Sequence, residues 1–382
     1  MTQPHQTNVN ANPARERAIG ALLGLAVGDA VGTTLEFKPR ASIRPISDMV
    51  GGGPFGLKPG QWTDDTSMAL CLGHSLLACR GFDAADQMRR YVDWRDKGYL
   101  SSTGSFFDIG NATNAALIRF QRTGNPIAGS VDPGSAGNGS IMRLAPVPIL
   151  YHRDLDAATR LAVESSRTTH GAPECLEASA FLSRALVRAI RGAPKEVILF
   201  GDDRPYHEPS IRAIAAGQYR ALAVSQVRGT GYVVDCLSAA LWCFLRADSY
   251  EMAVLLAANL GDDADTTAAV CGQIAGAFFG RDGIPAHWRA RVFMGDEIAQ
   301  LAGDLFDLGD LAFNETGTGR QGFEPWVHLL GEQPLSRRLR SATPAPPQRS
   351  SGKGEIRTHG EDWPHNGFQD RRLKPLGHLS GP

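Results

Sequence analysis

The sequence predicts an all-α fold, a single compact multi-helix domain, and three observations on its 382 residues support that class. Apolar residues recur with helical spacing, for example at Leu182, Leu186 and Ile190, whereas alternating β-branched runs of useful length are absent from the sequence. Hydrophobic residues make up 42% of the chain, which is enough to bury a core and excludes an intrinsically disordered protein. No linker divides the helical part, so we expect one domain rather than two.

Helical patterns follow one another from about Ala14, after a polar segment, 1–13, that we expect to be disordered. We expect helices over residues 66–80, 84–95, 111–122, 155–167, 174–191, 209–226, 233–245, 250–258, 266–279 and 285–302. Long loops rich in glycine and polar residues lie between them, at 28–36, 51–65, 98–114, 132–143 and 261–267. Because glycine allows close backbone approach, we expect several of these loops to converge on a ligand.

The net charge of −1 is an average over two unlike parts of the chain. Residues 337–382 contain nine Lys or Arg against four Asp or Glu, together with six Pro and six Gly, and show no apolar period. We interpret this stretch as a disordered basic tail, and its composition also fits a stretch that is not part of the native protein. The predicted domain is therefore 14–336, and it is acidic, so we do not expect nucleic acid as a partner.

The sequence also bears on the compartment in which the protein works. None of its six cysteines forms a C-x-x-C motif, and most lie in apolar helical stretches, which is typical of buried reduced thiols in a cytoplasmic protein. No apolar run reaches the length of a membrane span, so we expect no membrane partner. Residues 18–30 resemble the apolar part of a signal peptide, but Glu16 and a long polar leader argue against that interpretation.

Two short acidic motifs, 61–67 and 261–267, each stand directly before an apolar helix. One interpretation is helix capping, with Thr63 at the N-cap and two aspartates in the first turn. Capping needs only one side-chain oxygen, however, and two such motifs facing each other would supply four carboxylates and two threonine hydroxyls. Such an oxygen-rich set, without a neighbouring His or Cys pattern, favours a two-metal site for Mg²⁺ or Mn²⁺ over a zinc site.

Seven motifs in the same order resemble the ADP-ribosylglycohydrolase family, whose best-known bacterial branch is the ADP-ribosyl-dinitrogen reductase hydrolase. They are residues 25–32, 35–37, 62–66, 104–111, 137–143, 169–171 and 261–267. The resemblance runs from about Ile19 to Gly280 and leaves the tail without a counterpart. It implies an all-helical fold with two Mg²⁺ or Mn²⁺ ions in a central cleft, and removal of ADP-ribose from modified side chains, often arginine.

The resemblance also implies the residues of the metal site. The ligands would be Thr63, Asp64, Asp65, Asp263, Asp265 and Thr266. The sequence departs from the family at one position, since the second motif commonly begins Gly-Gly-Asp, whereas here it begins Gly261-Asp262-Asp263. Two alternatives stay open for Asp262: its side chain supports the metal ligands from behind, or it faces outward.

Glu36 and Asp108 are the candidate catalytic residues, because the resemblance places both near the metals and departure of a guanidine needs a delivered proton. Without the resemblance, Glu36 would pass for a surface acid and Asp108 for an Asx-turn residue. Which of the two transfers the proton stays open.

The resemblance further implies a substrate-binding set: Asn111, Gly137, Asn138, Gly139, Ser140, Arg143, His170 and Tyr232. Residues 137–140 would contact the pyrophosphate through backbone N–H groups, although an ordinary turn is the alternative. Arg143 would pair with a phosphate or with a core acid, and His170 would lie on the ligand side or be structural. Tyr232 would stack on the adenine or pack in the core.

The sequence thus predicts metal-dependent hydrolysis of the N-glycosidic bond between ADP-ribose and a modified acceptor, with protein arginine as the leading acceptor. Alternatives are another linkage, to serine, nucleic acid or free ADP-ribose derivatives, and a non-catalytic helical protein that binds ADP-ribose. The intact aspartates argue against the last alternative, because a decayed enzyme loses its ligands first. The expected partner is an ADP-ribosylated protein or small molecule, and we expect a monomer.

Overall fold

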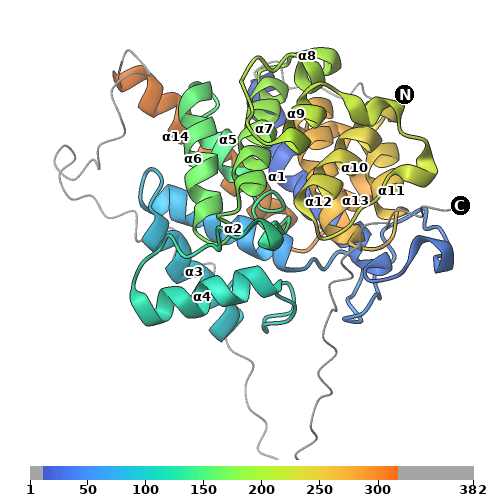
Figure 1. The fold of residues 1–382 in the computed structure, drawn as a ribbon, viewed down its shortest axis with the longest axis horizontal. Helices are drawn as coiled ribbons and strands as arrows, with labels where there is room; N and C mark the ends of the chain where they lie inside the picture. Colours follow the sequence, from blue (N-terminus) through green and yellow to red (C-terminus); the bar gives the residue numbers. More distant parts are fainter. Residues whose placement is uncertain (1–11, 317–382) are drawn as a thin grey trace, which may run out of the picture. The chain divides into compact units, whose positions relative to one another are not determined.

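The computed structural model describes residues 12–316, and their regular secondary structure is helical (Figure 1). The predicted all-α class is confirmed. The chain divides into two units, 1–326 and 327–382, and the second lies wholly outside the described residues. The predicted tail, 337–382, the predicted domain end at 336 and nearly all of the predicted segment 1–13 also fall outside them.

Fourteen α-helices lie in the described residues, joined by loops and short 3₁₀ turns. They are α1 (Pro13–Gly32), α2 (Asp64–Ala78), α3 (Ala84–Lys97), α4 (Asn111–Thr123), α5 (Pro146–Leu150), α6 (Leu155–Arg167), α7 (Pro173–Ile190), α8 (Lys195–Phe200), α9 (Pro209–Ala215), α10 (Val233–Arg246), α11 (Tyr250–Ala258), α12 (Ala264–Phe279), α13 (Ala286–Arg291) and α14 (Gly295–Thr316). The periodic patterns therefore located most of the helices.

Two of the predicted helices are wrong in extent. The stretch 209–226 contains only α9, because Gly217 adopts a left-handed conformation (φ 73°) and two 3₁₀ turns follow it. The stretch 285–302 is divided between α13 and α14, and Met294 lies between them with a positive φ of 56°. The short helices α5 and α8 were not predicted, since five or six residues are too few to show a helical period.

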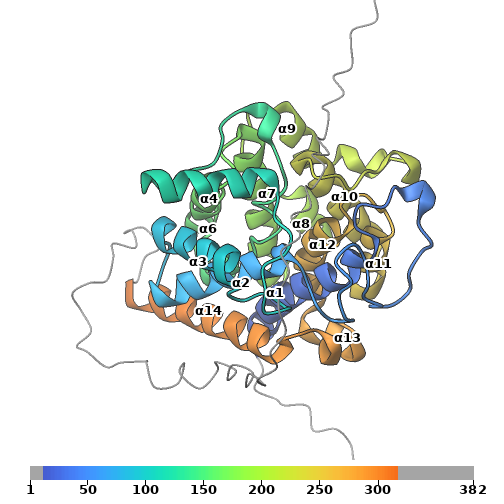
Figure 2. The ribbon, with the colours of Figure 1, turned by 90° about the horizontal axis from the view of Figure 1, so that it is seen from below.

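The centre of the fold is a pair of helices, α1 and α12, which lie side by side (Figures 1 and 2). Four glycines of α1, spaced four residues apart, face small residues of α12, and a Cβ at any of these glycines would collide with a backbone carbonyl oxygen of α12. We call this contact the glycine seam: Gly20, Gly24, Gly28 and Gly32 of α1 against Gly276, Gly272, Ala268 and Ala264 of α12. The seam brings the two backbones into direct contact, and it places the C-terminal end of α1 beside the start of α12.

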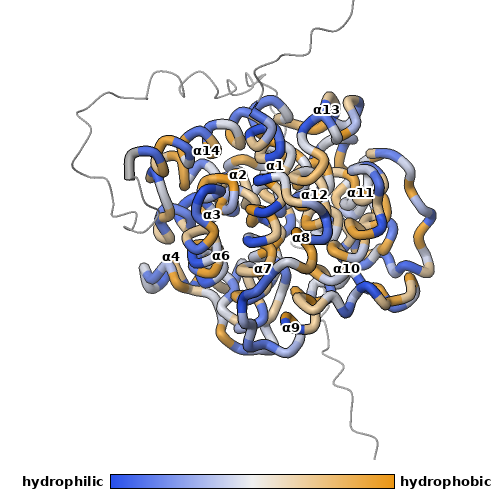
Figure 3. The backbone as a smooth tube through the Cα atoms, turned by 90° about the horizontal axis from the view of Figure 1, so that it is seen from above, coloured by the Kyte–Doolittle hydropathy of each residue, from blue (hydrophilic) through white to orange (hydrophobic). Residues whose placement is uncertain are grey.

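Helix α1 is apolar along most of its length (Figure 3), and its residues from Ala18 to Gly32 are buried. Among the described residues, it is the one helix whose length and hydropathy would suit a membrane span, yet its apolar window is entirely enclosed by the protein. The residues that resemble a signal peptide therefore form the centre of this fold. Of the six free cysteines, five are buried, as expected, and Cys79 is exposed.

Candidate functional site

The start of α2 is held by a carboxylate that comes from α1. Asp29 accepts hydrogen bonds from the backbone N–H groups of Thr63 (2.9 Å) and Thr66 (3.0 Å). It also accepts from both hydroxyls, at 2.9 Å for Thr63 and 2.6 Å for Thr66. Thr63 occupies the N-cap position but its own side chain makes no capping bond, so capping by this motif's own side chains is the wrong interpretation.

The start of α12 likewise has an N-cap residue whose side chain does not cap the helix. Asp263 is at its N-cap position without a capping bond, and its Oδ2 instead accepts a 2.7 Å hydrogen bond from the amide of Asn138. The Thr63 hydroxyl lies 3.2 Å from Oδ2 of Asp265, and the Thr266 hydroxyl lies 3.3 Å from Oδ2 of Asp65. The two acidic motifs, about 200 residues apart in the sequence, therefore face each other, as their composition predicts.

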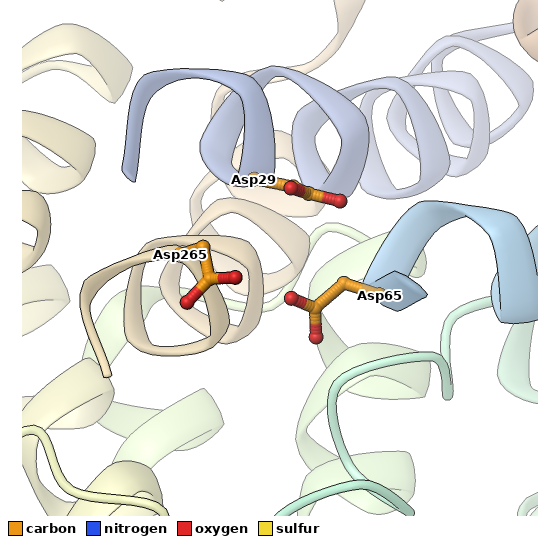
Figure 4. A group of neighbouring side chains, drawn as sticks. All are labelled: Asp29, Asp65 and Asp265. Carbon is orange, nitrogen blue, oxygen red and sulfur yellow. The ribbon is translucent and has the colours of Figure 1, made fainter. Parts of the chain in front are cut away.

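Seven carboxylates gather where the three helix ends meet (Figure 4 shows three of them, pointing toward one another). Oxygen atoms of Asp29, Asp65 and Asp265 lie within 4.8 Å of one another, and those of Glu36, Asp108 and Asp265 form a second group of the same size. None of the ion pairs among residues 12–316 includes a member of this set. We call it the acidic cluster: Asp29, Glu36, Asp64, Asp65, Asp108, Asp263 and Asp265.

Burial and mutual repulsion dominate the electrostatics of the acidic cluster. Burial, and then the charges of neighbouring carboxylates, raise the pKa of Asp64, Asp65 and Asp265 well above the usual value, and raise that of Glu36 to about 10. Burial also raises the pKa of Asp29 to about 6, because the hydrogen bonds from Thr63 and Thr66 offset only part of its effect. So many buried acids without a cation are costly, which indicates a site for a positively charged ligand.

Two features of the cluster suit divalent metal ions: it has buried carboxylate oxygens without hydrogen-bond partners, and its donor atoms are all oxygens. Oε2 of Glu36, Oδ1 of Asp65 and Oδ1 of Asp265 are buried without a hydrogen-bond partner among the described residues. The donors are carboxylate and hydroxyl oxygens, which suit hard ions such as Mg²⁺ and Mn²⁺. The predicted ligands Thr63, Asp64, Asp65, Asp263, Asp265 and Thr266 all lie at these two helix starts.

A strained pair of backbone segments holds one side of the cluster. Phe37 and Asp262 are both left-handed, with φ of 59° and 55°, and the N–H of Phe37 donates to the carbonyl of Asp262 over 2.7 Å. The N–H of Asp262 donates in return to the carbonyl of Lys38 over 2.8 Å. This mutual pairing fixes Glu36 next to Asp263. Glycine adopts the positive φ of position 262 most easily, and aspartate tolerates it better than most other residues.

The two candidate proton carriers lie together. Glu36 is only 3% exposed, so its interpretation as a surface acid is wrong. Asp108 is half-buried, with a left-handed backbone (φ 55°) and a pKa that burial raises to about 6. The charges of Asp263 and Asp29 also raise the pKa of Asp108, whereas its interactions with Asp64 and with the N–H of Ile109 lower it.

The glycine-rich loop 137–140 lies beside Asp263 and is supported from behind. A Cβ at Gly139 would come within 2.6 Å of the His170 ring, so this position requires glycine. Burial, followed by the charge of Arg143, lowers the pKa of His170 to about 3, so the ring is neutral and holds the loop by packing. Arg143 is fully buried and donates to the Gly139 carbonyl and the Thr169 hydroxyl. No acid is among these partners in residues 12–316, so pairing with a core acid is the wrong alternative, whereas contact with a phosphate stays a prediction.

The remaining predicted substrate residues lie around the same loop. Tyr232 is 39% exposed, so core packing is the wrong interpretation for it, and its hydroxyl donates to both carboxylate oxygens of Glu174 (2.7 and 2.8 Å). Gly137 pairs with Tyr232 in an isolated antiparallel bridge. Ser140 is buried against Ser179, and Asn111 is exposed at the first position of α4.

Asp29 is the member of the site that the sequence did not single out. It stands alone among apolar residues of α1, and its carboxylate is fully buried. A lone charge within an otherwise apolar helix is costly unless it has buried partners, so this was the signal in the sequence that could have found it.

A family model described as ADP-ribosylglycohydrolase matches residues 10–314. The chain is 46% identical over 305 residues to the ADP-ribosylarginine hydrolase Tri1 of Pseudomonas putida (strain GB-1), covering 80% of this chain and 82% of the relative. It is 33% identical to the ADP-ribosyl-[dinitrogen reductase] glycohydrolase of Rhodospirillum rubrum, covering 73% and 91%. A solved structure, an ADP-ribosylglycohydrolase-related protein complex, is 43% identical with a TM-score of 0.69, covering 78% of this chain and 99% of that one.

Proposed function

The chain belongs to the ADP-ribosylglycohydrolase family, and from this premise we propose that it hydrolyses the N-glycosidic bond between ADP-ribose and arginine side chains of modified proteins. The acidic cluster carries the proposal, because its buried carboxylates have the orphaned oxygens that the chemistry of this family needs. Two relatives that are 46% and 43% identical bear the name ADP-ribosylarginine hydrolase, which supports arginine over serine, nucleic acid or free ADP-ribose derivatives as the acceptor.

The proposal includes two divalent ions, Mg²⁺ or Mn²⁺, at the starts of α2 and α12. Their ligands would be Thr63, Asp64, Asp65, Asp263, Asp265 and Thr266. When bound, such ions polarise their oxygen ligands and lower the pKa of a coordinated water. Asp29 already accepts hydrogen bonds from four donor groups of Thr63 and Thr66, so its part is to fix these two residues in place.

Glu36 and Asp108 supply the proton chemistry in this proposal. Cleavage of an N-glycosidic bond passes through a positively charged, oxocarbenium-like state, which the surrounding carboxylates stabilise. When the C–N bond of a guanidinium breaks, the bonding electrons go to the nitrogen and a neutral guanidine leaves. A carboxyl that burial keeps protonated at neutral pH can assist by donating a hydrogen bond or its proton to that nitrogen. Glu36 and Asp108 are both candidates for this donor: burial raises the pKa of Glu36 to about 10, which keeps it protonated at neutral pH, and that of Asp108 to about 6, which leaves it protonated in a minor fraction of molecules.

The rest of the ADP-ribose would lie along loop 137–140. Among the described residues, the N–H groups of Gly139 and Ser140 have no hydrogen-bond acceptor, which leaves both available to a diphosphate. Asn138 would connect this loop to the cluster through its bond to Asp263. The exposed ring of Tyr232 would stack on the adenine, and Asn111 would lie on the same side. We propose the cytoplasm as the location, since buried free thiols suit a reducing compartment.

The test is release of ADP-ribose from arginine-, serine- and nucleic-acid-linked substrates with Mg²⁺ or Mn²⁺, and with EDTA as the control. We expect release from the arginine linkage, and loss of activity in EDTA. Asp65→Ala and Asp263→Ala should each lower kcat by about 100-fold or more. The matched control is Asp262→Asn, which removes a charge next to Asp263 but outside the cluster and should leave activity unchanged.

A second readout does not depend on turnover. Binding of Mg²⁺ or Mn²⁺ should raise the melting temperature of the wild-type protein and of Asp262→Asn, but not that of Asp65→Ala. A wild-type protein that releases ADP-ribose from none of the substrates, or full turnover by Asp65→Ala, would overturn the proposal.

A further inference from the structure

Three phenylalanines from three different loops meet beside the acidic cluster. The ring centroids of Phe37 and Phe55 are 6.3 Å apart in an edge-on arrangement, and those of Phe55 and Phe107 are 5.3 Å apart. We call this set the aromatic ridge. Phe37 directly follows Glu36 and Phe107 directly precedes Asp108, so both ends of the ridge adjoin a candidate proton carrier.

Folding energetics alone do not account for Phe37. Its side chain is 63% exposed, so it gains little from burial, and its backbone has a positive φ of 59°, which is unfavourable for a bulky residue. It is held there by the hydrogen bond from its N–H to the carbonyl of Asp262. A large apolar side chain that is both strained and exposed at the edge of a reactive site indicates a role in function.

The ridge lies on the side of the site where the acceptor must lie. A proton donor has to be within hydrogen-bond reach of the leaving nitrogen, so the acceptor must contact Glu36 or Asp108. In the proposed function, loop 137–140 and Tyr232 bind the ADP-ribose. The ridge is then free to contact the other half of the substrate, the acceptor arginine. Aromatic faces next to an acidic cluster suit a planar cation, because a guanidinium stacks on rings and is attracted by carboxylates.

We propose, on the basis of the proposed function, that Phe37, Phe55 and Phe107 form the acceptor subsite. The guanidinium of the modified arginine stacks on this ridge while Glu36 or Asp108 contacts its nitrogen. The ridge thereby selects arginine over neutral acceptors, and its exposed rings also contact the polypeptide that carries the arginine.

The test compares the two halves of the substrate in Phe37→Ala, Phe107→Ala and the double variant. With ADP-ribosylated arginine as substrate, we expect each single variant to lower kcat/KM about five- to tenfold, mainly through KM. Inhibition by ADP-ribose, the other product, should keep its constant, whereas inhibition by agmatine should weaken. Phe37→Tyr and Phe107→Tyr should restore the wild-type values, because an aromatic face is retained.

Leu311→Ala is the matched control, since it removes an apolar side chain of similar exposure (56%) from α14, and it should change none of these values. Melting curves check that all variants are folded. If the wild-type enzyme hydrolyses the arginine linkage and the double variant has the same kcat/KM and agmatine inhibition, the ridge is not the acceptor subsite. If the wild-type enzyme hydrolyses nothing, the proposed function fails; agmatine binding, followed by NMR and lost in the double variant, would then still support the ridge.

Discussion

The glycine seam and the strained loops at Phe37, Asp108 and Asp262 bring acids together by opposite means. In the seam, side chains are absent and ordinary helical backbones touch, so that Asp29 and Asp265 are fixed by close packing. In the loops, residues with side chains take left-handed conformations that glycine would adopt more easily. The comparison shows that close packing in the seam stabilises the fold, so added side-chain atoms there should be destabilising. In the loops, strained backbone conformations lower the stability but position the carboxyls of Glu36 and Asp108.

The largest effect should come from adding one methyl group to the seam. In Gly28→Ala the new Cβ would collide with the carbonyl oxygen of Ala268, and two packed helices cannot separate cheaply. We expect a loss of about 3 kcal/mol or more in the free energy of unfolding, measured with urea. Gly134→Ala is the control, since its Cβ would meet only Asp132 at ordinary distance (3.4 Å). Equal stability of the two variants would show that the seam is not tightly packed.

Asp29 should give the next effect, because it belongs to the seam helix and to the cluster. Asp29→Ala leaves four buried donors of Thr63 and Thr66 without their acceptor, so we expect a loss of about 2–3 kcal/mol in EDTA. Asp65→Ala should instead be as stable as wild type in EDTA, or more so, because it relieves repulsion among buried acids. If both variants lose the same stability, the assignment of Asp29 as the residue that positions Thr63 and Thr66, and of Asp65 as a metal ligand, is wrong.

Acid should weaken the core that the seam organises. Burial, followed by the charge of Arg90, lowers the pKa of His74 on α2 to about 4, against about 6.5 in the unfolded chain. Between these values the unfolded chain binds a proton that the folded chain does not, so stability falls as the pH falls. From pH 6.5 to pH 5 wild type should lose about 2 kcal/mol more than His74→Gln, measured by urea unfolding at each pH. Parallel pH profiles of the two proteins would contradict this assignment.

The smallest effect should come from relieving strain in the loops. Asp262→Gly removes the side chain at a positive φ of 55°, so we expect the protein to gain about 0.5–1 kcal/mol of stability with unchanged kcat. Asp262→Ala provides the comparison, because alanine cannot bond to its own backbone and should be less stable than aspartate there. A large fall in activity of the glycine variant would give Asp262 a place in the reaction.

The sequence predicted what depends on local pattern. Period and composition are enough to locate long helices, and two acidic helix starts of the same composition are enough to propose that residues such as Asp65 and Asp265 meet. Short helices such as α5 were not predicted, because they are too short to show a helical period. The break at Met294 was not predicted either, because a left-handed backbone conformation does not change the hydropathy pattern.

What the sequence could not supply is the pairing between distant segments. The partner of Asp29 is a helix start 34 residues away, and the support of Gly139 is a histidine ring from another loop. The sequence left two interpretations open for Tyr232, and the choice between them depends on exposure, which is set by the segments that cover a residue and not by its type. The glycine spacing of α1 was visible in the sequence, but only α12 gives it a meaning.

The glycine seam also sets the order in which this protein can be made. It joins residues 20–32 to residues 264–276, so the two halves of the acidic cluster come from opposite ends of the folded region. A ribosome that adds about 5–20 residues per second needs roughly 10–50 s to reach α12 after α1 has been synthesised. During that time the apolar helix α1 lacks the partner that covers its glycine face in the folded protein. A chain that stalls before residue 263 has only the acidic helix start of α2, so it lacks half of the proposed metal ligands.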